Sequence, residues 1–190
     1  MTGIILAGGR SSRMGRDKST LPWETSDLLN VIIEKLGTVC DDLIVVSNVP
    51  RDIKRKEVRV VADIFSQMGP LGGIHAGLCH ARHQYAFVTG CDMPYLVPDA
   101  VRYLLEEVQG WDIAIPSQGE YYEPLFSCYS KSCLPNIELL LNKSVRRIAE
   151  ILKLMRYKAI DWENFRRFDP ELKLFTNINT EEDYKQASDK

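Results

Sequence analysis

Apolar segments alternate with amphipathic segments along the first two thirds of the chain. Several apolar segments are rich in valine and isoleucine without alternating polar residues, which is typical of strands covered on both faces. This pattern predicts strands at Gly3–Gly8, Asp42–Asn48, Val58–Asp63, Tyr85–Gly90 and Asp112–Pro116. Helical spacing predicts helices at Asp27–Leu36, Leu71–Arg82 and Pro98–Val108. Such alternation predicts a Rossmann-like α/β domain of three layers, α/β/α, around a mostly parallel but mixed sheet.

The order of elements is less regular beyond Pro116. We predict a strand at Leu125–Tyr129, one or two helices within Leu134–Leu154 and a further strand at Leu172–Ile178. Thr180 is a candidate N-cap for a closing helix, with Asp183 at the third helical position. The segment Tyr157–Pro170 has no clear period. No repeat or Pro/Gly/Ser-rich linker interrupts the chain, so we expect residues 1–190 to form one domain.

The composition is that of an ordinary globular protein, with 45% apolar and 26% charged residues in a chain of 190. The 24 basic and 26 acidic residues give a net charge of −2. That balance provides no general electrostatic reason to bind nucleic acid or an anionic membrane. No apolar run approaches the ~20 residues of a membrane-spanning helix, and we find no signal peptide. We therefore expect a soluble, cytoplasmic protein.

The cysteines and histidines of the chain form no recognisable metal site. The cysteines are odd in number and lack a C-x-x-C pair, which argues against a disulfide framework or structural zinc. We interpret all five as reduced core thiols: Cys40, Cys79, Cys91, Cys128 and Cys133. Three histidines cluster around one predicted helix without an acidic partner there, and we assign them no function: His75, His80 and His83.

A loop rich in glycine and basic residues follows the first predicted strand. This glycine-basic loop (residues 8–18) combines Gly8, Gly9 and Gly15 with Arg10, Arg13, Arg16 and Lys18. Glycines allow a ligand close to the backbone amides, and the cations add charge-assisted donors for phosphate oxygens. The spacing matches neither a P-loop nor the G-x-G-x-x-G dinucleotide motif. The loop is therefore either an unusual anion site or a solvated turn.

Polar residues follow other predicted strands at the same edge of the sheet. Asp92 lies just beyond Tyr85–Gly90, where a hard carboxylate suits Mg²⁺, although it could instead cap the turn before Pro94. Asp63 and Asn48 end two further predicted strands, where surface caps and turn asparagines are also common. The Gly69–Gly73 segment could present amides to an anion or simply start a helix. Ligands of open α/β sheets bind at this edge.

The run Leu6–Lys18, L-A-G-G-R-S-S-R-M-G-R-D-K, resembles the signature of nucleotidyltransferases with a glycosyltransferase-A-like fold. Further segments of the chain resemble motifs of the same group in the same order: Gly69–Ile74, Cys91–Pro94, Glu123–Phe126 and Phe175–Thr180. The last two make the chain most similar to the molybdenum cofactor guanylyltransferases. The chain departs from the pattern of this group at Trp23–Asp27, where a glycine and a proline are often present. This difference puts the conformation of that loop in doubt.

The resemblance implies magnesium-dependent transfer of GMP from GTP to the phosphate of molybdenum-molybdopterin, with release of pyrophosphate. It implies nucleotide contacts by Leu6, Ala7, Gly8, Gly9, Lys18, Asn48, Asp63 and Asp92. It implies catalytic roles for Arg13, Lys18 and Asp92, with Asp92 as the metal ligand, and acceptor contacts by Asn177 and Asn179. Implied partners, besides GTP and molybdopterin, are other proteins of the cofactor pathway and apo-molybdoenzymes.

Two alternatives stay open from the sequence. The first is a related nucleotidyltransferase that uses CTP or another acceptor. The second is a nucleotide-binding module without activity, against which the joint presence of Lys18, Asp63 and Asp92 argues.

Overall fold

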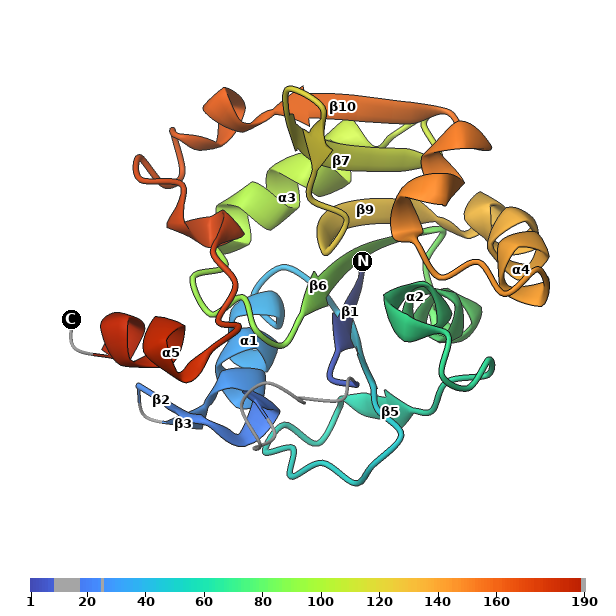
Figure 1. The fold of residues 1–190 in the computed structure, drawn as a ribbon. Helices are drawn as coiled ribbons and strands as arrows, with labels where there is room; N and C mark the ends of the chain where they lie inside the picture. Colours follow the sequence, from blue (N-terminus) through green and yellow to red (C-terminus); the bar gives the residue numbers. More distant parts are fainter. Residues whose placement is uncertain (9–17, 25, 189–190) are drawn as a thin grey trace.

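The computed structural model describes residues 1–8, 18–24 and 26–188, and its centre is a mixed sheet (Figure 1). Eight strands form this sheet, in the order β10-β7-β9-β6-β1-β4-β5 with β8 paired to β7. Their bounds are β1 Thr2–Leu6, β4 Asp42–Val46, β5 Arg59–Val61, β6 Tyr85–Gly90, β7 Ile113–Gln118, β8 Tyr121–Tyr122, β9 Phe126–Ser130 and β10 Tyr157–Asp161. A separate hairpin pairs β2 (Pro22–Trp23) with β3 (Ser26–Asp27).

Strand direction fixes where a site can form. β5, β4, β1 and β6 run parallel to one another, so their carboxyl ends meet at one edge. β9 is antiparallel to both β6 and β7, while β10 is again parallel to β7. The first half of the sheet therefore provides an edge made of four strand ends, and β9 begins at that same edge.

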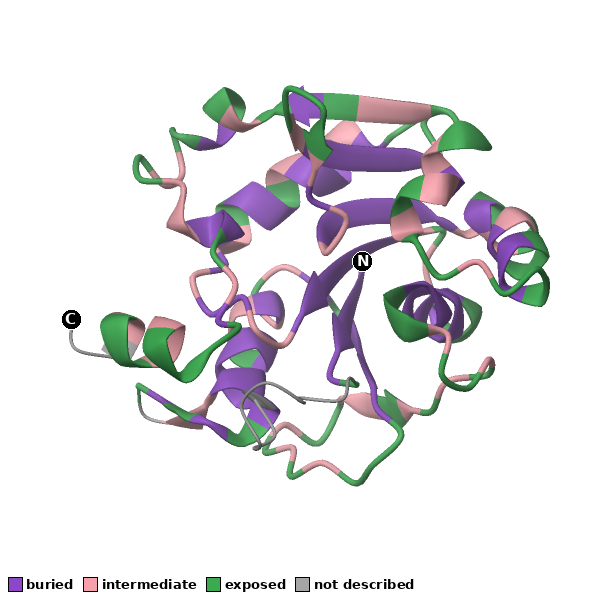
Figure 2. Ribbon diagram, in the orientation of Figure 1, coloured by how far each residue is buried: buried purple, intermediate pink, exposed green. Residues whose placement is uncertain are grey.

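Helices cover both faces of the sheet, which confirms the expected three layers (Figure 1). On one face, α1 (Leu28–Leu36) and α3 (Pro98–Glu107) bury residues such as Ile32 and Leu104 in the core that contains Ile5. On the other, α2 (Gly69–His80) and α4 (Leu134–Asn142) pack into the core that contains Ile4. Neighbouring residues of β1 thus enter different cores, which explains why the strand is apolar throughout (Figure 2).

Helix α2 lies unusually close to β1. A Cβ atom added at Gly77 would come within 2.5 Å of Ile4 Cγ2, so only glycine fits between this helix and the strand. The contact packs the last part of α2 against the middle of β1.

The closing helix α5 (Glu181–Ser188) begins as expected. Asp183 N–H donates to Thr180 Oγ1 at 3.0 Å, and Asp183 Oδ2 accepts from the N–H groups of Asn179 and Thr180. The helix lies beside the β2–β3 hairpin, where Tyr184 donates to the carbonyl of Pro22 at 2.6 Å (Figure 1).

Five short 3₁₀ helices complete the described elements: η1 Lys18–Thr20, η2 Lys131–Cys133, η3 Ile148–Lys153, η4 Trp162–Phe165 and η5 Lys173–Phe175. The strand predicted at Leu172–Ile178 is wrong, because this segment forms η5 and irregular chain that bury Leu174, Phe175 and Ile178. β10 lies in the segment without a period. Leu134–Leu154 contains α4 and η3.

The thiol prediction needs one correction. Cys79 is exposed and Cys91 half-buried, so among the five cysteines only Cys40, Cys128 and Cys133 are buried in the core. Within the ranges that the structure describes, no helix is both long and apolar enough to cross a bilayer.

Candidate nucleotide-binding site

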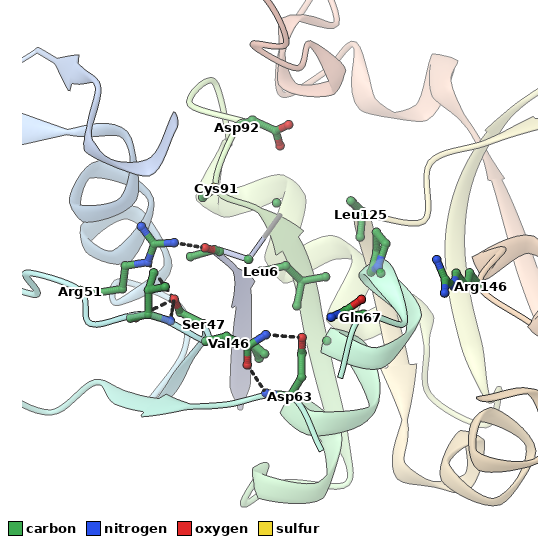
Figure 3. A pocket seen from close by; sticks show the side chains of 18 residues that line it. Leu6, Val46, Ser47, Arg51, Asp63, Gln67, Cys91, Asp92, Leu125 and Arg146 are labelled. Atoms are coloured by element: carbon green, nitrogen blue, oxygen red, sulfur yellow. Dashed lines mark hydrogen bonds between the residues drawn. The ribbon is translucent and has the colours of Figure 1, made fainter. Parts of the chain in front are cut away.

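A cavity of about 680 Å³ opens at the carboxyl ends of the parallel strands (Figure 3). Its walls come from the ends of β1, β4 and β6, from the segment after β5 and from the start of α2. The cavity brings together six of the residues that the sequence nominated: Leu6, Ala7, Gly8, Asn48, Asp63 and Asp92. The remaining lining is Val46, Ser47, Val49, Arg51, Gln67, Gly69, Pro70, Gly73, Gly90, Cys91, Leu125 and Arg146.

Asn48 and Asp63 form a reciprocal pair in the floor of this cavity (Figure 3). Asn48 Nδ2 donates to Asp63 Oδ2 at 2.8 Å, and the backbone N–H of Asp63 donates to Asn48 Oδ1 at 2.9 Å. The two bonds join the chain beyond β4 to the chain beyond β5. They fix the orientation of a carboxylate that faces the cavity.

Gly8 leaves space where the cavity meets β1. The nearest described heavy atom to a Cβ added there is the carbonyl oxygen of Val46, at 3.9 Å. The described protein atoms therefore leave room for a side chain at position 8, so packing alone does not explain the glycine. The absence of a side chain instead lets a ligand approach the backbone.

Asp92 lies on a turn that hydrogen bonds from distant parts of the chain hold in place. Its carbonyl oxygen accepts a hydrogen bond of 2.8 Å from the N–H of Ile178. Lys35 of α1 donates to the carbonyl of Pro94 at 2.6 Å, and burial lowers the pKa of this ammonium group. A Cβ added at Gly90 would lie 2.4 Å from Asp92 Oδ1, so the carboxylate rests against a glycine.

The donor set around Asp92 fits Mg²⁺ better than a metal held by protein side chains alone. Among the described residues, no group of three or more His, Cys, Asp or Glu side chains could hold a metal ion. Mg²⁺ commonly takes one or two carboxylates and completes its shell with water and substrate phosphates. The single carboxylate of Asp92 at the cavity wall meets that requirement.

Helix α2 points its first turn at the cavity. Gly69 is its first residue, with φ +66°, and Pro70 follows, so the Gly69–Gly73 segment does start a helix. Gly73 then allows Leu6 to approach, because a Cβ there would lie 3.1 Å from Leu6 Cδ2. The predicted helix start is confirmed, while anion binding by its amides stays a prediction.

Several nominated residues cannot be placed in the cavity. Gly9 and Arg13 lie outside the described residues, as does the side chain of Lys18, whose backbone begins η1. Asn177 and Asn179 are not among the described residues that line the cavity; they flank Ile178, which bonds the Asp92 backbone. The main-chain bond of Ile178 therefore places this segment beside the Asp92 turn.

Sequence reasoning did not identify Arg51, Gln67 or Arg146, all of which line the cavity. Each occurs in a loop without a motif, and only the tertiary structure brings it to the site. Glu123 was identified as part of a motif, but its burial was not foreseen. Burial raises the pKa of Glu123, while hydrogen bonds from Tyr121 and the N–H of Leu125 lower it by less.

Two histidines have acidic partners from outside their own segment. The buried His75 side chain lies 3.1 Å from Glu138 of α4, and His83, beyond the end of α2, lies 2.9 Å from Asp41. Neither pair lines the cavity. The His75 side chain is packed in the interior, and the His83–Asp41 pair lies at the surface.

Comparison with known proteins identifies the group to which this architecture belongs. The family model described as "MobA-like NTP transferase domain" matches residues 3–159. A probable molybdenum cofactor guanylyltransferase of Pelotomaculum thermopropionicum is 37% identical over 98% of this chain and 91% of its own length. The molybdenum cofactor guanylyltransferase of Desulfosudis oleivorans is 35% identical over 98% and 94%.

Solved structures agree. The crystal structure of molybdopterin-guanine dinucleotide biosynthesis protein A from Archaeoglobus fulgidus superimposes with a TM-score of 0.85 and 30% identity, covering 100% of this chain and 97% of that one. The 2-C-methyl-D-erythritol 4-phosphate cytidylyltransferase of Thermus thermophilus shares the fold alone, with a TM-score of 0.72 at 12% identity over 98% and 96%. The chain belongs to the MobA-like NTP transferase family.

Proposed function

We propose that this chain transfers GMP from GTP to the terminal phosphate of molybdenum-molybdopterin, giving molybdopterin guanine dinucleotide cofactor and pyrophosphate. The observation that carries the proposal is the single cavity in which Asp92 and the Asn48–Asp63 pair meet, at the carboxyl ends of parallel strands. Relatives at 35–37% identity named for this reaction support it.

An oxygen of the acceptor phosphate attacks the α-phosphorus of GTP. The new P–O bond forms as the bond between the α-phosphorus and its bridging oxygen breaks, and that oxygen leaves with pyrophosphate. The acceptor phosphate is already ionised, so no general base is needed. Catalysis then consists chiefly of in-line positioning and neutralisation of oxygen charge.

Asp63 is the group that we assign to base selection. The Watson–Crick edge of guanine offers two adjacent donors, N1–H and the 2-amino group, which suit a carboxylate acceptor. Asn48 holds that carboxylate through the reciprocal hydrogen bonds. Cytosine offers a single amino donor on this edge, and the pair therefore favours GTP over CTP.

Asp92 is the group that we assign to Mg²⁺. When bound by Asp92, Mg²⁺ would neutralise negative charge on the phosphate oxygens. Arg13 and Lys18 of the glycine-basic loop are assigned to the pyrophosphate side on grounds of charge. Gly8 and Gly9 are also assigned to the phosphates, Gly8 because of the open space beside its backbone and Gly9 because of the resemblance in sequence.

Asn177 and Asn179 are assigned to the acceptor. The support is indirect: both flank Ile178, whose main chain bonds Asp92, so they belong to the segment beside the proposed metal ligand. The product would pass in the cytoplasm to other proteins of the cofactor pathway and to apo-molybdoenzymes.

The first experiment is thermal unfolding with GTP, CTP, UTP and ATP, each with and without Mg²⁺. A ligand at 100 times its Kd stabilises by about 2.7 kcal/mol, or roughly 5–10 °C for a chain of this size. We expect a shift largely restricted to GTP and increased by Mg²⁺. A preference for CTP would indicate cytidylyl transfer, and no shift with any nucleotide would contradict the proposal.

The second experiment tests the metal assignment. Asp92→Asn is expected to lower kcat on the order of 100-fold without changing the fold, because transition-state charge is no longer neutralised. Asp99→Asn is the matched control, since this exposed aspartate pairs with Arg102 on α3 away from the cavity. Equal turnover by the Asp92 variant and the wild type would contradict the assignment of Asp92 to Mg²⁺.

A further inference from the structure

Arg51 lies at one side of the cavity (Figure 3), where its hydrogen bonds join three parts of the chain. Its Nε donates to Ser47 Oγ at 2.8 Å and its Nη1 to Ser19 Oγ at 2.5 Å, while Nη2 donates to the carbonyl of Ala7. The three acceptors are neutral and belong to buried residues. A planar guanidinium with a fixed fork of donors can reach all three simultaneously.

The sequence positions of the three acceptors show which segments of the chain Arg51 connects. Ala7 directly follows β1 and Ser19 lies in η1, so the two residues flank the glycine-basic loop. Ser47 follows β4 and precedes Asn48. One side chain therefore holds both ends of that loop against the strand that leads to the Asn48–Asp63 pair.

The two ends differ in what else holds them. The N–H of Ala7 donates to the carbonyl of Val46 at 3.0 Å, which extends the pairing of β1 with β4 by one residue. Ser19 belongs to a 3₁₀ helix and not to the sheet. The Arg51–Ser19 bond thus connects a segment outside the sheet to the edge where the strand ends meet.

We propose that Arg51 is a positioning residue: it sets the spacing between the two ends of the glycine-basic loop before the nucleotide binds. This inference rests on the proposed function for its effect on GTP, but the tether itself exists without ligand. A lysine could not reproduce it, because a single ammonium on a flexible stem lacks the planar fork.

The first test needs no nucleotide. Hydrogen exchange is compared for wild type, Arg51→Ala, Arg51→Lys and Arg55→Ala. Arg55 is the matched control because it lies on the same connection and contacts Glu34 and Glu57 instead of the cavity. We expect amides of residues 18–24 to exchange about tenfold faster in both Arg51 variants, with α3 and the Arg55 variant unchanged. Unchanged exchange in residues 18–24 of both Arg51 variants would overturn the proposal.

The second test is a double-mutant cycle on Mg·GTP binding with Arg51→Ala and Ser19→Ala. If Arg51 acts through the loop end, each single variant raises Kd about tenfold and the double variant is no weaker than Arg51→Ala. Fully additive losses would mean that Arg51 acts on the nucleotide independently of Ser19, and would overturn the proposal. Wild-type affinity in Arg51→Lys would do so too, since charge alone would then suffice.

Steady-state kinetics separate positioning from general damage. We expect Arg51→Ala to raise KM for GTP about tenfold with a much smaller change in the acceptor KM. Equal increases in both KM values would contradict a role at the loop ends. If wild type fails to bind any nucleotide, the proposed function fails, while the exchange measurement still decides whether Arg51 tethers the loop.

Discussion

Asn48 and Asp63 orient each other: an amide and a carboxylate at the ends of two neighbouring strands exchange two hydrogen bonds of 2.8 and 2.9 Å. Neither residue is in a regular element, and the pair links the chain that leaves β4 to the segment after β5. The carboxylate is thereby presented to the cavity in one direction.

Removing the amide should misdirect the carboxylate. We expect Asn48→Ala to weaken GTP binding about tenfold, because Asp63 loses both the donor to its side chain and the acceptor of its N–H. Isothermal titration would measure the Kd. In a cycle with Asp63→Ala the losses should couple by about 1 kcal/mol, and strict additivity would show that the two residues act separately.

A methyl group at residue 90, in the cavity lining, should displace the Asp92 carboxylate. The added Cβ of Gly90→Ala would lie 2.4 Å from Asp92 Oδ1, so the carboxylate has to move. We expect at least a tenfold loss of Mg²⁺-dependent turnover. In the Asp92→Asn background the same substitution should cost little more, because the group that it displaces no longer binds metal. A large additional loss would mean that Gly90 serves another purpose.

Gly77→Ala tests the packing of α2 on β1. Alanine favours a helix by up to about 1 kcal/mol over glycine, but the new Cβ would lie 2.5 Å from Ile4 Cγ2. We expect the steric cost to win, with a net loss of about 1–3 kcal/mol in the free energy of unfolding. Denaturant unfolding in the Ile4→Ala background, where the obstructing atoms are gone, should show no such loss. A stabilised single variant would contradict this account.

Glu123 should make the free energy of unfolding depend on pH. Burial raises the pKa of its carboxyl in the folded state. The folded chain therefore holds this proton more tightly than the unfolded chain. Its contribution to stability is greatest below about 4.3, the ordinary glutamate value, and falls as the pH rises through the folded pKa.

Urea unfolding across this pH range would measure the effect. Relative to wild type, Glu123→Gln should gain stability as the pH rises, since it has no proton to lose. Tyr121→Phe should steepen the decline, because the Tyr121 hydroxyl hydrogen bond lowers the pKa of Glu123. Parallel curves for wild type and Glu123→Gln would refute this role of the carboxyl.

Much of the fold was predictable because buried parallel strands are apolar throughout. β6 occupies the predicted Tyr85–Gly90, β4 and β5 lie within their predicted ranges, and β1 begins one residue before its predicted start and ends two residues before its predicted end. β10 was missed because it is an edge strand in which only Ile160 is buried, so hydrophobicity does not mark it. Leu172–Ile178 was mistaken for a strand because its apolar residues are buried by a 3₁₀ turn and irregular chain.

Some residues of the candidate site could likewise be identified from the sequence, and others could not. Asp92, Asp63 and Asn48 were identifiable because each follows an apolar strand, and parallel strands bring such residues to one edge. Arg51 and Arg146 were not, because their loops carry no motif and reach the cavity only through the tertiary fold. The placement of Asn177 and Asn179 also depends on a long-range backbone bond that no local pattern encodes.

That bond, between the Ile178 N–H and the Asp92 carbonyl, also orders events during synthesis. The ribosome completes β1, β4, β5 and β6 long before Ile178 emerges, so the strand ends can assemble while the Asp92 turn still lacks this partner. Full assembly of the Asp92 turn is therefore delayed until synthesis has passed Ile178.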